Sequence, residues 1–238
     1  MRKEPFTVGS YVHVYNRGNR KQVIVHDTKD RWRFLQILYY FNNRFSPENI
    51  FRELRKLFRL NLNKQFTWPE SWPERKPIVK IINFFLADNH FHLLLKEIQD
   101  GGIAMFMKKL GDGMTGYFNK KYQETGRLFQ GSYKARLVDK DTYFKYLSVY
   151  IQVKNAFEFY PGGLEKAIRE FDKAFEFAIN NPFCSLADFA GDRHSPIIDK
   201  DLLGKLFPNK KDYKKFAKEC ILGRKLEERL GGAIKDFE

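Results

Sequence analysis

The chain has 238 residues, of which 43% are hydrophobic and 16% aromatic, which is enough for a packed core and excludes a disordered chain. Its formal net charge of +14 favours a polyanionic partner, with nucleic acid ahead of an anionic membrane surface. No apolar run reaches the roughly 18 residues of a membrane span, and no signal-peptide pattern opens the chain, so we expect a cytoplasmic protein. The two cysteines form no CxxC pair, so we expect neither a disulfide framework nor a zinc cage.

The first third of the sequence predicts a strand, a helix and an insertion. YVHVYNRG is rich in Val and Tyr and predicts a strand that ends at Gly18. DTKDRWRFLQILYYFNNRF predicts a helix capped by Asp27 or Thr28. Residues 46–77 contain a short helical piece followed by the proline-rich TWPESWPERKP, so we expect an insertion there.

The rest of the sequence predicts a hairpin, then a helix, a strand and a second helix, and a helical tail. IVKIINFFLADNHFHLLLKE predicts two strands that meet at a turn over residues 87–89. GGIAMFMKKLGDGMTGYFNKKYQ is amphipathic and predicts a helix, GRLFQGSYKARLV predicts a fourth strand, and DKDTYFKYLSVYIQVKNAF predicts a second strong helix. Beyond YPGG, the chain is largely helical.

The order β-α-β-β-α-β, followed by a helix, predicts a fold class. It is typical of a ferredoxin-like or RRM-like α+β domain with an antiparallel sheet and helices on one face. We expect that domain to cover residues 1–160, interrupted by the insertion over residues 46–77, and a helical C-terminal extension to cover residues 161–238.

The stretch HFH places two imidazoles on one face of the second hairpin strand. Side chains alternate along a strand, so Phe91, Leu93 and Leu95 share one face, while His90 and His92 share the other, about 7 Å apart along the strand. Neutral imidazoles in this arrangement can converge on one divalent cation. Mg²⁺ or Mn²⁺ suits an incompletely ligated site, with water and a phosphate in the open positions. The alternative is a pair of histidines that only form hydrogen bonds near a sheet edge.

The helix TYFKYLSVYIQVKNAF carries Tyr143, Tyr146 and Tyr150 at helical spacing. Aromatic side chains in this pattern are usually part of a core. In the functional alternative, one phenolate attacks a phosphodiester, which requires removal of the proton or nearby positive charge because the pKa of tyrosine is about 10. A cation bound by histidine would meet that need.

Basic and aromatic residues alternate between residues 103 and 140, in a pattern that suits single-stranded nucleic acid. Basic residues bind phosphates and aromatic rings stack on unpaired bases. A solvated helix face over a buried aromatic stripe is the alternative. The aromatic residues are Phe106, Tyr117, Tyr122, Phe129 and Tyr133. The candidate DNA-binding residues, including a second patch after the first strand, are Asn16, Arg17, Arg20, Lys21, Lys108, Lys120, Lys121, Arg127, Gln130, Lys134 and Arg136.

Four motifs occur in the order and spacing of a known family. YVHVYNRGNRKQVIVHD, ADNHFHLLLKE, GYFNKKYQETGRLFQGSYKARLV and YLSVYIQVKN together resemble the single-tyrosine HUH transposases, in particular the REP-associated tyrosine transposases. NPFCSLADFAGDRHSPIIDKDLL also resembles the C-terminal extension of that group, so the resemblance covers nearly the whole chain.

The resemblance implies cleavage and rejoining of single-stranded DNA, including DNA with hairpins. It implies that His90 and His92 bind the metal and that Tyr150 is the nucleophile, which forms a 5′-phosphotyrosine link and leaves a 3′-hydroxyl. No nucleotide cofactor is needed, because the link conserves the phosphodiester energy. Relatives with such extensions suggest a monomer, and compact relatives form homodimers.

The sequence departs from the family at the third metal ligand. The family often places Asn or Gln four residues after the tyrosine, where this chain has Lys154, and a protonated lysine cannot coordinate a metal. Asn155 and Gln152 are the substitutes, and we expect Asn155. This departure keeps open a non-catalytic single-stranded nucleic-acid-binding protein derived from a transposase. Phosphodiester hydrolysis without a covalent step is a further alternative.

Overall fold

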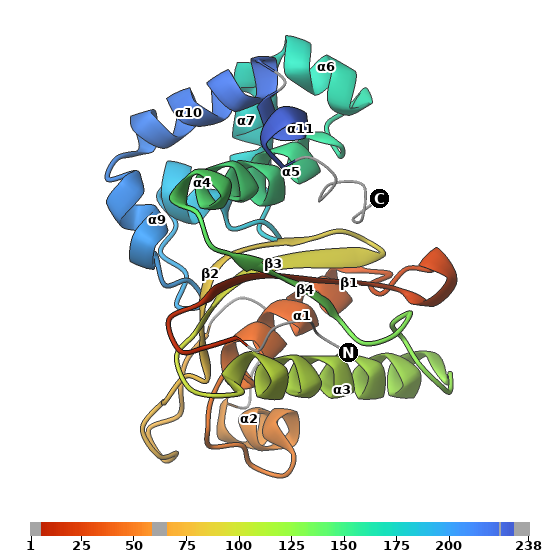
Figure 1. Ribbon diagram of the computed structural model, residues 1–238. Coiled ribbons are helices and arrows are strands. Elements are labelled where there is room, and N and C mark those ends of the chain that lie inside the picture. The colour runs from red at the N-terminus through yellow and green to blue at the C-terminus, as the bar shows by residue number, and fades with distance from the viewer. Residues whose placement is uncertain (1–5, 59–65, 224, 231–238) are drawn as a thin grey trace.

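The computed structural model describes residues 6–58, 66–223 and 225–230, and shows a four-stranded antiparallel sheet between two layers of helices (Figure 1). The strand order is β2-β3-β1-β4. The strands are β1 (Tyr11–Arg17), β2 (Val79–Leu86), β3 (His90–Glu97) and β4 (Lys134–Val138). This order, with one helix after β1 and one after β3, is the ferredoxin-like arrangement, so the predicted fold class is confirmed.

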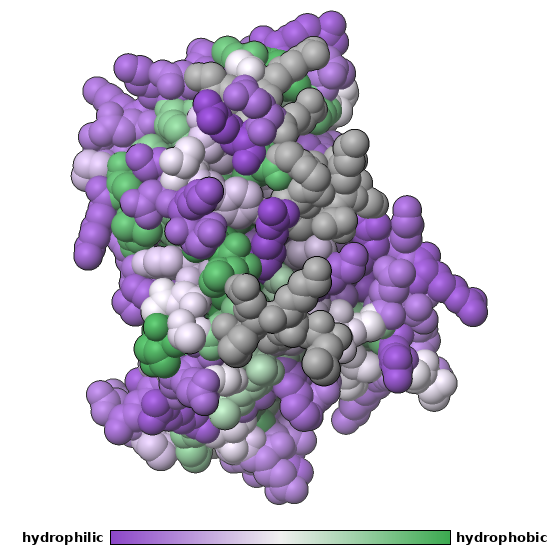
Figure 2. Space-filling view, in the orientation of Figure 1, coloured by the Kyte–Doolittle hydropathy of each residue, from purple (hydrophilic) through white to green (hydrophobic). Residues whose placement is uncertain are grey.

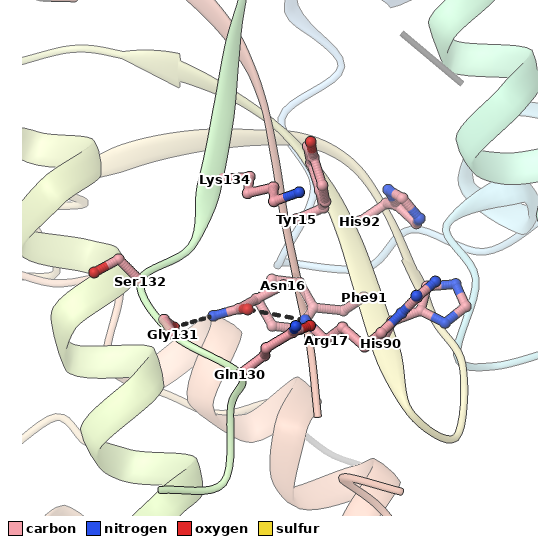
Figure 3. A pocket seen from close by; sticks show the side chains of 10 residues that line it. All are labelled: Tyr15, Asn16, Arg17, His90, Phe91, His92, Gln130, Gly131, Ser132 and Lys134. Atoms are coloured by element: carbon pink, nitrogen blue, oxygen red, sulfur yellow. Dashed lines mark hydrogen bonds between the residues drawn. The ribbon is translucent and has the colours of Figure 1, made fainter. Parts of the chain in front are cut away.

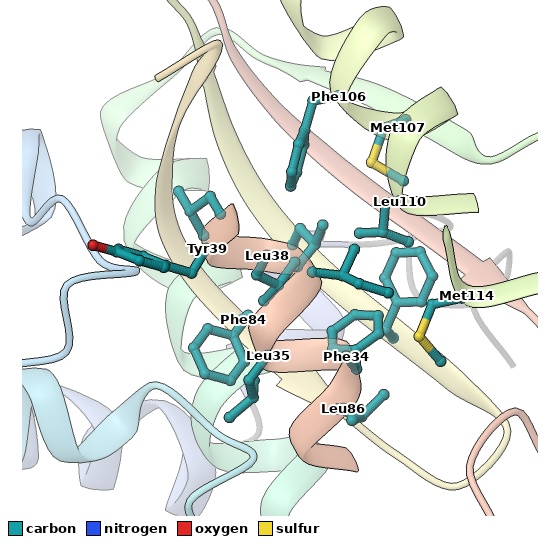
Figure 4. Close-up of a cluster of buried hydrophobic side chains, with 14 of the residues drawn as sticks. Phe34, Leu35, Leu38, Tyr39, Phe84, Leu86, Phe106, Met107, Leu110 and Met114 are labelled. Atoms are coloured by element: carbon teal, nitrogen blue, oxygen red, sulfur yellow. The ribbon is translucent and has the colours of Figure 1, made fainter. Parts of the chain in front are cut away.

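The first face of the sheet is covered by α1 (Thr28–Tyr40) and α3 (Gly102–Tyr122). Helix α1 begins at Asp27, whose side chain accepts a hydrogen bond from the backbone of Asp30 in a capping box, as the sequence predicts for this position. Side chains of both helices interlock with β2 and β3 in one buried cluster (Figure 4). Phe91, Leu93 and Leu95 belong to this cluster, so the alternation predicted for β3 is correct.

The second face is covered by one long helical stretch and by the helices that follow it (Figure 1). The long stretch consists of α4 (Asp141–Val149), η2 (Tyr150–Lys154) and α5 (Asn155–Phe157). The later helices are α6 (Gly163–Arg169), α7 (Phe171–Ile179), α8 (Leu186–Ala190), α9 (Asp201–Leu206), α10 (Lys210–Leu222) and α11 (Lys225–Leu230). They form a second core with the sheet, and Leu94 of β3 points into it.

The insertion predicted after α1 packs against that helix. It contains α2 (Ile50–Phe58) and a tryptophan-rich loop, in which the rings of Trp68 and Trp72 lie 5.0 Å apart. Trp68 stacks on Tyr40 of α1 at 6.4 Å. Residues 59–65 of the insertion and residues 231–238 of the C-terminal extension lie outside the described residues.

The C-terminal region also covers the open edge of β2. The backbone of Leu86 donates to the carbonyl of Phe183 at 3.0 Å, and that of Asp199 donates to Ile81 at 2.9 Å. Farther on, Asp201 accepts hydrogen bonds from lysines of β2 and β3. Main-chain and charged contacts therefore fix this region to the sheet that carries the histidines.

The visible surface is mostly hydrophilic, with hydrophobic residues in small groups between polar ones (Figure 2). Among the helices that the structure describes, none is both long enough and apolar enough to cross a membrane.

Candidate functional site

The second face of the sheet brings β3, β1 and the helix that carries Tyr150 together. In the antiparallel register, Tyr15 lies opposite His92, and Arg17 lies opposite His90. Residues directly opposite one another point to the same face. The ring of Tyr150 packs edge-on against His92, with the centroids 5.6 Å apart. The histidine pair and the tyrosine of two separate sequence motifs thus lie in one place.

The two imidazoles are close together, and each is oriented by a neighbour. The ring centroids of His90 and His92 lie 5.2 Å apart, and both rings lie along the same strand in Figure 3. Nδ1 of His90 is 2.7 Å from the side-chain oxygen of Asn89. Nδ1 of His92 is 3.0 Å from Nε2 of His13. Because both contacts use Nδ1, the Nε2 atoms are the ones suited to a ligand.

Burial keeps these histidines neutral. It lowers the pKa of His90 to about 4, with help from the positive charge of Arg17. It also lowers the pKa of His92 well below the ordinary value, and His13 and His90 add to that effect. Burial lowers the pKa of His13 to about 3. A neutral imidazole is the form that binds a metal ion, so all three are in that form at pH 7.

His13 is a member of the site that the sequence prediction missed. It is fully buried, stacks on His92 and packs against Tyr15, with ring centroids 5.2 Å apart in both pairs. The signal was present in YVHVYNR, because strict alternation puts His13, Tyr15 and Arg17 on one face. Without the register between β1 and β3, nothing in the sequence identified that face as the one with His90 and His92.

The helix widens at the tyrosine. Residues 150–154 form a π-helical turn, in which the backbone N–H of Asn155 donates to the carbonyl of Tyr150. In an α-helix, the carbonyl of Tyr150 would accept from the N–H of the fourth residue after it, so the π turn accommodates one extra residue. Asn155 therefore takes the place, relative to Tyr150, that a residue at the fourth position has in a regular helix.

Lys154 lies beside the tyrosine ring. Its ammonium is 5.3 Å from the ring centroid of Tyr150 and 2.6 Å from a carboxylate oxygen of Glu158. The Lys154 side chain is only 15% exposed, so this charge acts where screening by water is weak. The site thus contains an ion pair, Lys154 with Glu158, next to the phenol ring.

The two candidates for a third ligand have different surroundings. The side chain of Gln152 donates to Ser185 at 2.8 Å and accepts from the hydroxyl of Tyr213 at 2.7 Å, so it holds the C-terminal region. Asn155 is 2% exposed, and its Nδ2 has no hydrogen-bond partner among the described residues. A buried amide of this kind is costly unless it binds something. Gln152 is thus engaged by the C-terminal region and Asn155 is not; a metal would use the amide oxygen of Asn155, whereas the atom without a partner is its nitrogen.

The donor set fits a hard divalent cation in an open site. Among the described residues, no group of three His, Cys, Asp or Glu side chains is arranged to hold a metal. His90, His92 and the amide of Asn155 could supply two nitrogens and one oxygen. Mg²⁺ and Mn²⁺ commonly keep several water ligands, so few protein ligands suffice. This assignment of a metal and its ligands stays a prediction.

A pocket of about 240 Å³ opens beside the histidines (Figure 3). Among the predicted DNA-binding residues, Asn16, Arg17, Gln130 and Lys134 line it. Arg136 lies opposite His13 in the register of β4 and so points to the same face of the sheet. Basic side chains therefore flank the histidines from two strands.

Arg20 and Lys21 form an exposed turn next to this pocket, within the short 3-10 segment η1 (Asn19–Lys21). Both have positive φ, 53° and 62°, which is uncommon for residues with a side chain. The turn is tied to the hairpin beside His90, because the side chain of Asn89 donates to the carbonyl of Lys21. The second predicted patch is therefore attached to the site.

The remaining predicted DNA-binding residues lie along or beside α3, away from that pocket. Lys121 binds Asp27 and Asp30, at 2.8 and 2.5 Å, so its charge is compensated within the protein. Lys108 pairs with an aspartate one turn on. Lys120 and Arg127 are exposed and line two other hollows.

Most of the aromatic residues between 103 and 140 are structural, so the expectation that they stack on bases is wrong for them. Phe106 and Phe129 are buried in the core of the first face. The hydroxyls of Tyr117 and Tyr122 both donate to Asp30. The alternative of a buried aromatic stripe therefore holds for these four residues.

One family model and one solved structure are similar to this chain. Residues 72–154 match the family model described as "Transposase IS200 like", a segment that includes both His90 and Tyr150. A solved structure, "Structure of the REP associates tyrosine transposase bound to a REP hairpin", is similar over 84% of this chain and 93% of its own, with 10% identity and a TM-score of 0.48. No curated protein sequence matches the chain.

Proposed function

We propose that this chain, in which residues 72–154 match the family model of IS200-like transposases, cuts and rejoins single-stranded DNA through Tyr150. The substrate is a single strand flanked by hairpins, and the intermediate is a 5′-phosphotyrosine. The observation that carries the proposal is the packing of the Tyr150 ring against His92, 5.6 Å between centroids, on a sheet face lined by basic side chains.

The chemistry follows from the residues around Tyr150. The phenolic oxygen attacks the phosphorus of a backbone phosphodiester, and the bond from phosphorus to the 3′ oxygen breaks. The phenol loses its proton and the departing 3′ oxygen gains one, so a 3′-hydroxyl is formed. Attack by a 3′-hydroxyl on the phosphotyrosine reverses the step and joins strands. The number and kind of phosphodiester-type bonds stay constant, so no nucleotide cofactor is consumed.

Each residue of the site has a separate task. His90, His92 and Asn155 would hold a Mg²⁺ or Mn²⁺ ion, which would polarise the phosphate as a Lewis acid. Arg17 and Lys134 bind the non-bridging oxygens and orient the strand. Lys154 stabilises the negative charge on the phenol oxygen as it loses its proton.

The test is a covalent adduct between the protein and DNA. Incubation with labelled single strands that contain hairpins, in the presence of Mn²⁺, should give a labelled band that survives denaturing electrophoresis. We expect Tyr150→Phe to abolish the band and Tyr146→Phe, a matched change one helical turn earlier, to retain it. An adduct that persists in Tyr150→Phe would contradict the proposal.

Two other functions give different results in the same assay. A non-catalytic nucleic-acid-binding protein binds the strands but forms no adduct. Hydrolysis without a covalent step gives nicked DNA that is insensitive to Tyr150→Phe.

A further inference from the structure

His13 lies in the middle of β1, directly beside the candidate metal ligand His92, and none of the proposed steps uses it. The two side chains are 0% and 2% exposed, and Nε2 of His13 is 3.0 Å from Nδ1 of His92. A valine or leucine would fill a buried place in a strand without burying polar atoms, which are costly to bury. The imidazole therefore calls for an explanation through its hydrogen bond.

The 3.0 Å contact holds a single proton between the two rings, because one nitrogen must donate and the other must accept. Burial keeps both rings neutral, and Arg136, which lies opposite His13 on β4, also opposes a positive charge there. Each neutral ring carries one proton, so the pair has two hydrogen-bonded arrangements. Either Nδ1–H of His92 donates to Nε2 of His13, or Nε2–H of His13 donates to Nδ1 of His92.

Only the first arrangement lets His92 bind a metal ion. In that arrangement the proton of His92 is on Nδ1, so Nε2 presents its lone pair to a ligand. In the second arrangement the proton is on Nε2, and the lone pair of Nδ1 is used by His13. A cation bound by His92 therefore needs His13 as a hydrogen-bond acceptor.

His90 has a different kind of partner. Its Nδ1 lies 2.7 Å from the side-chain oxygen of Asn89, and the nitrogen of the same amide donates to the carbonyl of Lys21. An amide oxygen can only accept, so His90 carries its proton on Nδ1 whether or not a metal is bound. His92, in contrast, depends on a ring that can either accept or donate.

The strand and the neighbouring ring hold His13 in place. β1 is an inner strand of the sheet, and His13 lies opposite Leu94 of β3 on one side and Arg136 of β4 on the other. Its ring stacks on that of His92, with an interplanar angle of 22°. An acceptor fixed in this way keeps the imidazole that it binds in one orientation.

We propose that His13 is a positioning residue for metal binding: its Nε2 accepts a hydrogen bond from Nδ1–H of His92, which presents Nε2 of His92 to a divalent cation. The proposal rests on the proposed function, because it concerns the metal site of that function. His13 acts through His92 and does not itself bind the ion.

Binding of Mn²⁺ to the protein without DNA tests this role, with EPR of the unbound ion as the measurement. His13→Leu removes the acceptor and should raise the dissociation constant for Mn²⁺ about 10–100-fold, the usual cost of losing such a partner of a metal ligand. His13→Gln carries an amide oxygen at a similar reach and should restore the dissociation constant to within about threefold of the wild type.

NMR of nitrogen-labelled imidazole rings shows directly which nitrogen carries the proton. In the Mg²⁺-loaded wild type and in Mg²⁺-loaded His13→Gln, His92 should carry it on Nδ1. In metal-free His13→Leu it should move toward Nε2, because a buried Nδ1–H would have lost its acceptor. The wild-type spectrum tests the proposal even where a variant fails to fold.

Val14→Ala is the matched control for stability. Val14 follows His13 on β1, is fully buried and belongs to the core of the other face of the sheet. Its truncation leaves a cavity and should lower the Tm, while the dissociation constant for Mn²⁺ stays within about twofold of the wild type.

Four results would overturn the role of His13. They are an unchanged Mn²⁺ dissociation constant in His13→Leu, an equal loss in His13→Gln, an equal loss in Val14→Ala, and a proton on Nε2 of His92 in the Mg²⁺-loaded wild type. If Mn²⁺ binding and the spectra are as expected but no adduct forms at Tyr150, the proposed function fails and the role of His13 stands. A wild-type protein that binds no Mn²⁺ would overturn both.

Discussion

At the scale of single residues, the structure distinguishes the two amides that the sequence offered as a third metal ligand, Asn155, which we expected, and Gln152. Gln152 is saturated by contacts with Ser185 and Tyr213, whereas the Nδ2 of buried Asn155 has no partner among the described residues. Gln152 therefore serves the fold, whereas Asn155 is the amide that we propose binds the metal through its oxygen. Substitution of Asn155 by alanine should therefore affect the reaction, and substitution of Gln152 by alanine should affect stability.

Asn155→Ala should leave the fold intact and impair the reaction. Loss of this proposed metal ligand should lower adduct formation by roughly one to two orders of magnitude and raise the Mn²⁺ concentration needed for half-maximal rate. The measurement is the initial rate of adduct formation across a Mn²⁺ titration. An Asn155→Ala variant that needs the same Mn²⁺ concentration as the wild type would show that Asn155 is not a metal ligand.

Gln152→Ala should do the reverse. It leaves the buried hydroxyl of Tyr213 with only its longer contact to Ser148, at 3.3 Å, and removes the amide that donates to Ser185, which together cost about 1–3 kcal/mol of stability. Urea unfolding should show this loss, while the Mn²⁺ requirement of the folded protein stays at the wild-type value. A large shift in metal requirement would mean that Gln152 also acts as a ligand.

At the scale of elements, α1 and α3 are joined at one carboxylate. Asp30 is fully buried and accepts hydrogen bonds from Lys121, Tyr117 and Tyr122. Burial by itself raises the pKa of Asp30, but these hydrogen bonds outweigh burial and hold the pKa well below its usual value. The start of α1 is thereby fixed to the end of α3.

Asp30→Asn should therefore weaken the contact between α1 and α3 and lower the free energy of unfolding. Removing one partner of a buried ion pair typically costs about 3 kcal/mol or more, because the other charge is left uncompensated. Urea unfolding at pH 7 should show this loss. Lys108→Gln, which removes an exposed ion pair on the same helix, is the control and should change stability by less than about 1 kcal/mol.

Some of these elements could be predicted from the sequence, and others could not. The hairpin, the face that His90 and His92 share, and the helix with Tyr150 followed from local periodicity, and the structure has all three. The π turn did not follow, because nothing in the local pattern of YIQVK requires a bond to the fifth residue. Likewise, the aromatic residues of α3 were assigned to DNA because the pattern does not reveal that Asp30, far along the chain, binds their hydroxyls.

At the scale of the whole molecule, Asp201 connects the C-terminal region to the sheet. It lies 2.8 Å from the ammonium of Lys80 and 3.1 Å from that of Lys96, and it also accepts from the hydroxyl of Tyr11. Burial raises the pKa of Asp201, but the hydrogen bonds from these three groups outweigh it and hold the pKa well below 3.8.

The lowered pKa of Asp201 predicts how stability depends on pH. A carboxyl with a lower pKa in the folded state stabilises that state above its unfolded pKa, near 3.8, and loses this contribution as the pH falls toward the folded pKa. Asp201→Asn should cost about 2 kcal/mol at pH 7, on the scale of hydrogen bonds to charged groups. The difference from the wild type in urea unfolding should be constant between pH 7 and pH 5 and shrink below the unfolded pKa. A difference that grows in acid would contradict this assignment.

The π turn at Tyr150 also bears on how relatives of this chain can be recognised. One residue added to a regular α-helix rotates every later side chain by about 100° around the axis, but a π turn confines the extra residue to a single turn of the helix. The distance between tyrosine and amide in the sequence can therefore change from four to five while their arrangement in space is kept. Motif searches that demand a fixed interval after the tyrosine will discard such chains, and a pattern that allows either interval, with any residue in between, will retain them.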